Sequence, residues 1–251
     1  MKNIGKLAVL GAVLAASTSF AFGDTITLGS FGAAGLAAYH PTVTVSNSEM
    51  QYAGNQIVAT VALIPATPTI SSIAPVNATD LNPSAVWFGP VTNSSWVGIN
   101  DKAGPMSTSN PGFGYYEFTT TFTAVGGLYS GNLDVMADDT MEVLLNNVLI
   151  PSLSFGALGG DLHCADGMPT CLVEDNLAIG SISLLTGTNT LTFIVKQAGT
   201  GPVGGTSDPS GMDFNGSLVQ STVPEPNSLM LLGTGLVSAA GMLLRRRRVT
   251  A

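Results

Sequence analysis

Segments in which apolar and polar side chains alternate with a period of two place the strongest constraint on the fold of this chain. In YYEFTTTFTA, residues 115–124, one face carries Tyr116, Phe118, Thr120 and Phe122, and the residues between them share the other face. An extended strand turns successive side chains to opposite sides of a sheet, whereas a helix repeats about every 3.6 residues. The alternation therefore predicts a half-buried antiparallel strand.

Two later segments extend this prediction to the whole middle of the chain. Residues 139–150 alternate in the same way, and Asn146-Asn147 predicts a two-residue turn, because asparagine tolerates a positive φ. Residues 186–197 alternate again. Outside the two ends no long stretch has helical periodicity. We expect an all-β fold, an antiparallel, jelly-roll-like β-sandwich over residues 24–222, which is long enough to bury a sizeable core.

The chain opens with the pattern of a secretory signal peptide. Two lysines precede a short apolar run, residues 7–16, and small residues follow it. Cleavage is expected before Asp24, with a second candidate position before Phe22. The alternative, an N-terminal membrane anchor, needs a longer apolar core. We therefore assign residues 1–23 to a signal peptide, which predicts an exported protein.

The C-terminus combines an uncharged run with a basic cluster. Residues 228–244 carry no charge, and at about 1.5 Å rise per residue they are just long enough to cross a bilayer core. Half of the eight lysines and arginines of the chain follow immediately, as Arg245, Arg246, Arg247 and Arg248. Such a cluster acts as a stop-transfer signal that stays on the cytoplasmic side. The pattern predicts a transmembrane helix over residues 228–244.

A short motif precedes that run. Pro224, Glu225 and Pro226 predict a stiff, extended segment, since each proline restricts itself and the residue before it. The order of motif, apolar helix and arginine cluster resembles the PEP-CTERM sorting signal, over residues 223–248. The resemblance implies recognition by exosortase, a membrane-embedded cysteine transpeptidase of Gram-negative bacteria, and an association with exopolysaccharide and biofilm. The alternative is a proline spacer before a plain anchor.

The charge of the middle region limits its partners. Between Asp24 and Val223 there are two lysines, Lys102 and Lys196, against fifteen aspartates and glutamates, a net charge of −13. Such a surface repels phosphate backbones, which excludes nucleic acid as a partner. An acidic, lysine-poor composition suits an extracellular β-protein.

The order of segments in the middle region also resembles a known architecture. An aromatic-rich start, with Trp87, Phe88 and Trp96, precedes the first alternating strand, and a long loop separates the later two. This order is similar to the galactose-binding-like jelly roll found in many carbohydrate-binding modules. The resemblance implies a role in carbohydrate recognition.

Two cysteines, Cys164 and Cys171, lie seven positions apart in HCADGMPTC. An exported chain meets an oxidising compartment, so we expect them to form a disulfide that closes a small loop. The alternative is a metal site with His163. That site has neither a fourth ligand nor a Cys-x-x-Cys spacing.

Four acidic residues form a candidate calcium site. Asp134, Asp138, Asp139 and Glu142 lie within nine positions, and Ca²⁺ takes six to eight oxygen ligands. No Asp-x-Asp-x-Asp-Gly loop accompanies them. The alternative is that Asp138 and Asp139 occupy a turn that opens a strand. Calcium is the only cofactor that the sequence suggests.

Four aromatic residues are candidates for sugar contact. The rings of Trp87, Trp96, Tyr115 and Tyr116 can stack on sugars, and asparagines and aspartates lie nearby in the sequence. The alternative is that these rings pack in the core or at its rim.

Motifs for catalysis are missing from the sequence. His40 and His163 are the only histidines, and there is no Gly-x-Ser-x-Gly or His-Glu-x-x-His motif. We expect a non-enzymatic protein, sorted to the cell surface or extracellular matrix, with a structural or adhesive role and with polysaccharide as a partner. The alternatives are a secreted carbohydrate-active enzyme with a spatial carboxylate pair, and a structural subunit stiffened by calcium.

Overall fold

The structure is a computed structural model, which describes residues 23–35, 40–57, 68–84, 87–105, 111–150, 174–197, 209–221 and 226–249. The predicted signal peptide, apart from Gly23, lies outside the described residues, as do both cysteines, Pro224 and Glu225. The expected disulfide therefore stays a prediction. Contacts divide the chain into two compact units, and Asp24–Gln220 is one of them.

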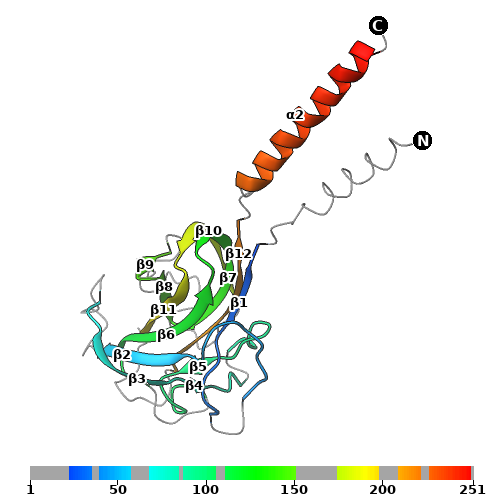
Figure 1. The fold of residues 1–251 in the computed structure, drawn as a ribbon. Coiled ribbons are helices and arrows are strands. Elements are labelled where there is room, and N and C mark those ends of the chain that lie inside the picture. Colours follow the sequence, from blue (N-terminus) through cyan, green and yellow to red (C-terminus); the bar gives the residue numbers. More distant parts are fainter. Residues whose placement is uncertain are drawn as a thin grey trace. The chain divides into compact units, whose positions relative to one another are not determined.

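Within the described residues, Asp24–Gln220 forms two six-stranded antiparallel sheets that make a sandwich (Figure 1). We name each sheet after a central strand. In the β7 sheet the order is β10 (Asp175–Leu184), β7 (Gly127–Asp138), β12 (Gly211–Gln220), β5 (Val97–Gly98) and β4 (Thr79–Asp80), with β1 (Thr25–Gly29) also paired to β12. In the β6 sheet the order is β3 (Ser71–Asn77), β2 (Gln51–Ile57), β6 (Gly114–Ala124), β11 (Gly187–Gln197), β8 (Thr140–Leu145) and β9 (Val148–Leu149). The predicted antiparallel β-sandwich is confirmed.

The alternating segments occupy the strands expected of them. On β6, Phe118 and Phe122 are buried, and Phe118 lies opposite Phe193 of β11. Between β8 and β9, Asn146 and Asn147 have φ values of 50° and 65°, as the predicted two-residue turn requires. Local sequence therefore accounts for the centre of the β6 sheet.

The main core lies between the two sheets. Phe193 of β11 and Phe214 of β12 belong to different sheets, and their ring centroids lie 4.4 Å apart. Leu133, Val135 and Ala137 of β7 are fully buried in the same core. Side chains at the intervening β7 positions consequently point to the outer side of the β7 sheet.

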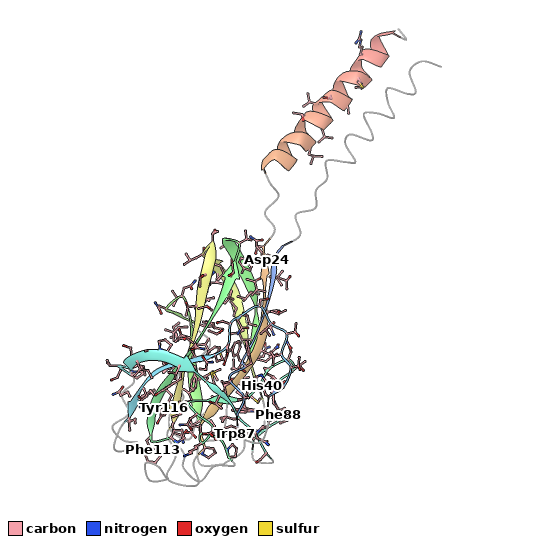
Figure 2. The ribbon with its side chains drawn as sticks, turned by 60° about the horizontal axis from the view of Figure 1, so that its bottom comes forward. Asp24, His40, Trp87, Phe88, Phe113 and Tyr116 are labelled. Carbon is pink, nitrogen blue, oxygen red and sulfur yellow. The ribbon has the colours of Figure 1, made fainter. Side chains whose placement is uncertain are left out.

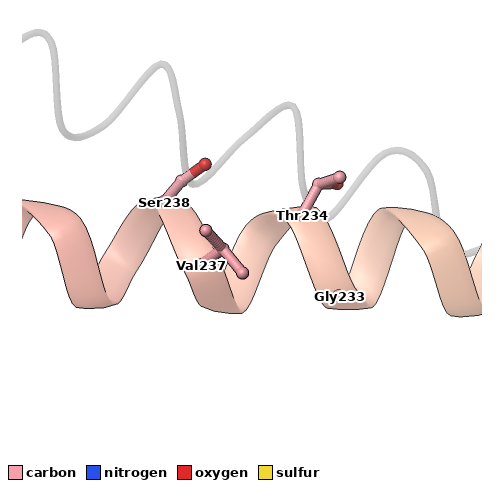
Figure 3. A pocket seen from close by; sticks show the side chains of 4 residues that line it. All are labelled: Gly233, Thr234, Val237 and Ser238. Carbon is pink, nitrogen blue, oxygen red and sulfur yellow. The ribbon is translucent and has the colours of Figure 1, made fainter.

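The other unit contains helix α2 (Pro226–Val249), which is longer than the expected 228–244 and includes the arginine cluster. Its middle is exposed, and a shallow pocket on it is lined by Gly233, Thr234, Val237 and Ser238 (Figure 3). Among the helices of the described residues, none is long and apolar enough to cross a membrane. The predicted transmembrane span is thus not supported.

Candidate functional site

A second apolar cluster lies on the outer side of the β7 sheet. The tryptophan cluster consists of Leu81, Trp87, Val91, Trp96, Ala103 and Met136. Trp87 and Trp96 stack with ring centroids 4.3 Å apart and an interplanar angle of 24°. The cluster lies near the start of β12, since a side chain on Gly211 would meet the Trp87 ring at 3.0 Å. Trp87 and Phe88 thus lie at the end of the sandwich opposite Asp24 (Figure 2).

Hydrogen bonds hold the loop that carries the two tryptophans, which we call the 87–96 loop. Trp87 Nε1 donates to Asp138 Oδ2 at 2.7 Å, and Trp96 Nε1 donates to the carbonyl of Phe88 at 3.0 Å. The backbone N–H of Val91 donates to Asp213 Oδ2 at 2.8 Å. The loop is therefore attached at its beginning, in its middle and near its end.

Asp213 is a fully buried carboxylate beneath this loop. Its position on β12 lies opposite Met136 of β7, on the outer side of the sheet. Ser30 Oγ lies 2.7 Å from Asp213 Oδ1. Burial raises the pKa of Asp213 from 3.8 to about 6, and hydrogen bonds from groups such as Ser30 and Val91 oppose that rise. The carboxylate connects β12, the segment after β1 and the 87–96 loop.

A second buried carboxylate, Asp80 of β4, lies in the same region. Its Oδ1 accepts hydrogen bonds from the Gly32 N–H and from Ser95 Oγ, both at 2.7 Å. Its Oδ2 pairs with Nδ1 of His40, whose side chain is half exposed. Ser30 Oγ also lies 2.7 Å from the carbonyl of Ser95, so the two carboxylates belong to one network.

Sequence reasoning missed this network. His40 was noted only as one of two histidines, and Asp80 lies 40 positions away from it. Ser30 and Asp213 are 183 positions apart. No local motif marks such pairs. The only sequence signal is at Asp213, which lies between the apolar residues Met212 and Phe214.

The four carboxylates of the predicted calcium site are separated. Asp134 points to the outer side of the β7 sheet, where Asn176 donates to it. Glu142 lies between the buried Met141 and Val143 of β8, so it points to the outer side of the other sheet. Asp138 accepts from Trp87. In the described part of the chain, no group of three or more metal-ligating side chains forms, because the chain passes from one sheet to the other at residues 138–139.

The four aromatic residues predicted to contact sugar are buried. Trp87 is 4% exposed, and Trp96, Tyr115 and Tyr116 are 2% exposed or less. Burial, followed by the Glu142 charge, raises the pKa of Tyr115 to about 12. The Tyr116 hydroxyl donates to the carbonyl of Gly112 at 2.5 Å. This burial corrects the prediction, because none of these rings offers a face to a ligand on the surface.

An exposed ring lies between the two buried tryptophans. Phe88 is 46% exposed, and it is the only exposed aromatic residue among the described residues. Phe88 belongs to the aromatic-rich segment of the sequence, in which only the two tryptophans were candidates for sugar contact. Alternation cannot identify it, because the 87–96 loop is irregular.

Of the residues predicted to form the sorting signal, those from Pro226 to Arg248 lie on helix α2 of the structure. Arg245 is exposed. A family model for the PEP-CTERM protein-sorting motif matches residues 222–248. The C-terminal segment is a PEP-CTERM sorting signal. The signal indicates an exported protein that is anchored and then processed by exosortase. It covers a small part of the chain and leaves the role of the sandwich open.

The search of curated proteins found no match. Among solved structures, a GH26-CBM35 β-(1,4)-mannanase of Podospora anserina matches 58% of this chain and 25% of its own, with 15% identity and a TM-score of 0.28. A ruminal GH26 endo-β-1,4-mannanase matches 47% of this chain and 21% of its own, with 16% identity and a TM-score of 0.23. The PA14 domain of the MpAFP antifreeze protein matches 41% of this chain and 43% of its own, with 10% identity and a TM-score of 0.21. The chain thus spans a quarter or less of each mannanase.

Proposed function

We propose that this exported protein is a non-enzymatic component of the cell surface or extracellular matrix, and that its β-sandwich binds polysaccharide there. Its role is structural or adhesive, within exopolysaccharide or biofilm. The sorting signal supplies delivery by exosortase. The function of the delivered domain then depends on the chemistry of the sandwich.

The observation that carries this proposal is the use of the buried carboxylates. Asp80 accepts from a backbone N–H and a serine, Asp138 accepts from Trp87, and Asp213 accepts from a serine and a backbone N–H. Each of these bonds joins separate segments of the fold. A glycosidase needs two carboxyl groups that face a sugar across a cleft. The hydrogen bonding of these three aspartates supports a structural role for them, which favours the non-enzymatic part of the proposal.

The outer side of the β7 sheet supports binding through polar groups. Asn176 of β10, Asp134 of β7 and Asn215 of β12 lie next to one another in register across three strands. Asn176 is exposed, and the other two are half-buried. Amide and carboxylate groups on a flat sheet can exchange hydrogen bonds with sugar hydroxyls, because they offer both donors and acceptors.

The test uses the exported protein purified from its native host. We expect it to be retarded in gels that contain neutral polysaccharide and to release no reducing ends from the same polysaccharide. Heat-denatured protein is the control for nonspecific retention. Release of reducing ends by the folded protein would overturn the non-enzymatic proposal. Migration unaffected by every polysaccharide would overturn the binding proposal.

A further inference from the structure

We infer that Phe88 is the sugar-stacking residue of this protein and that its ligand is a neutral pyranose chain. This inference rests on the proposed polysaccharide binding and assigns it to one loop. The 87–96 loop presents the Phe88 ring to solvent, while Trp87 and Trp96 on either side are buried.

The loop is held rigid by groups from distant parts of the chain. Trp87 Nε1 is held by Asp138, the Val91 N–H is held by Asp213, and Trp96 Nε1 holds the carbonyl of Phe88 itself. Binding loses less free energy when the contact residue is already ordered in the free protein. The backbone of Phe88 is ordered in this way, because its own carbonyl is one of the bonded groups.

The surroundings of Phe88 fit a small flat ligand. A side chain placed on Gly89 would meet no atom within 4 Å among the described residues, so the backbone next to Phe88 borders open space. Nearby in the sequence, Asn82 is half-buried and Ser84 is exposed, and both are polar. A stable protein–protein interface buries about 1,200–2,000 Å² in total, far more than one ring supplies. Within the described residues, one exposed ring with polar residues nearby in the sequence matches instead the apolar C–H face and hydroxyl rim of a pyranose.

The charge of the domain favours a neutral sugar. The residues from Asp24 to Val223 include fifteen carboxylates and two lysines. Asp138 and Asp213 both accept hydrogen bonds from the 87–96 loop. An excess of negative charge of this size repels an acidic sugar that approaches the domain, over a range of about 8 Å at physiological ionic strength. We therefore expect neutral chains to bind and acidic chains to be excluded.

The experiment compares the exported protein with three variants. Phe88→Ala removes the ring, Phe88→Trp keeps an aromatic face, and Leu128→Ala is the matched control. Leu128 of β7 is 48% exposed, close to the exposure of Phe88, and lies at the far end of its strand from Asp138. Isothermal titration uses cellohexaose, mannohexaose and galactan fragments as neutral probes, and oligogalacturonate as the anionic probe. Melting temperatures and sedimentation velocity are measured in parallel.

We expect wild type, Phe88→Trp and Leu128→Ala to bind at least one neutral probe, and Phe88→Ala to bind it about tenfold more weakly or worse, with an unchanged melting temperature. If Phe88→Ala binds a neutral probe as tightly as wild type, the inference fails while polysaccharide binding stands. Equal affinity for oligogalacturonate overturns the charge argument. If wild type binds no probe, the inference and the proposed binding fail together. Self-association that Phe88→Ala abolishes, without sugar binding, identifies the ring as a protein contact and also overturns the inference.

Discussion

Asp213 offers a quantitative test of the network beneath the 87–96 loop, through the pH dependence of the free energy of unfolding. Its pKa is raised by burial from 3.8 to about 6. The folded state therefore holds the proton more tightly than the unfolded state. The stabilisation is fully present below pH 3.8 and is lost as the pH rises through 6. Asp213 thus makes the protein more stable in acid, opposite to the usual effect of an aspartate.

The size of this effect follows from the two pKa values. Each pH unit between them corresponds to about 1.4 kcal/mol, so the full change is about 3 kcal/mol. Asp213→Asn removes it, because asparagine does not titrate. The variant can still accept from Ser30, but an amide NH₂ in place of Oδ2 loses the bond from the Val91 N–H, which costs about 1–2 kcal/mol at any pH.

The assay is urea denaturation of wild type and Asp213→Asn at pH 3.5, 5, 6 and 7, followed by tryptophan fluorescence. The difference in free energy of unfolding between the two proteins cancels the contributions of the other carboxylates. We expect the advantage of wild type over the variant to shrink by about 3 kcal/mol between pH 3.5 and pH 7. Asp134→Asn, at a half-buried position bonded to Asn176, is the control. A difference that stays constant with pH would refute the assignment of a buried, proton-binding Asp213.

Three further predictions test other parts of the molecule. Replacing residues 224–226 by alanines should leave the protein unprocessed, whereas the Asn227→Ala variant should be processed normally. Gel mobility in cell fractions measures the processing, and equal processing of both variants would refute recognition through this motif. Trp87→Phe should lower the free energy of unfolding by about 1.5–3 kcal/mol, because it removes the donor to the buried Asp138, and denaturant melts measure this. Calcium or a chelator should leave the melting temperature unchanged, since the carboxylates within residues 134–142 form no group of ligands, and a calorimetric shift would contradict this.

Sequence patterns predicted the parts of the fold in which buried and outward-facing positions alternate over several residues. β6 and β11 have eleven residues each, long enough for the period of two to appear. β4 and β5 have two residues each, too few for any period, and yet they support Asp80 and the end of the 87–96 loop. The sorting signal was predictable because its residues act in sequence order and need no tertiary contact.

The candidate site was not predictable in the same way, because distant segments decide which aromatic residue reaches the surface. Trp87, Phe88 and Trp96 are all large and apolar, and composition cannot rank them. Met136 of β7 and Leu81 after β4 cover the tryptophans and leave Phe88 outside. The sequence therefore could not separate the buried rings of Trp87 and Trp96 from the exposed ring of Phe88.

The scarcity of lysine and arginine in this domain bears on the way in which Asp213 is satisfied. A buried carboxylate is commonly neutralised by lysine or arginine, but this domain contains only Lys102 and Lys196. Asp213 is instead satisfied by hydroxyl and backbone donors, which are fixed to the chain at short reach. Such donors bring the backbone of their own segments close to the carboxylate. A long lysine side chain would reach the carboxylate from a distance and would not fix the position of its own backbone. An acidic, cation-poor composition therefore favours buried aspartates that order loops, and here the loop that is ordered is the one that exposes Phe88.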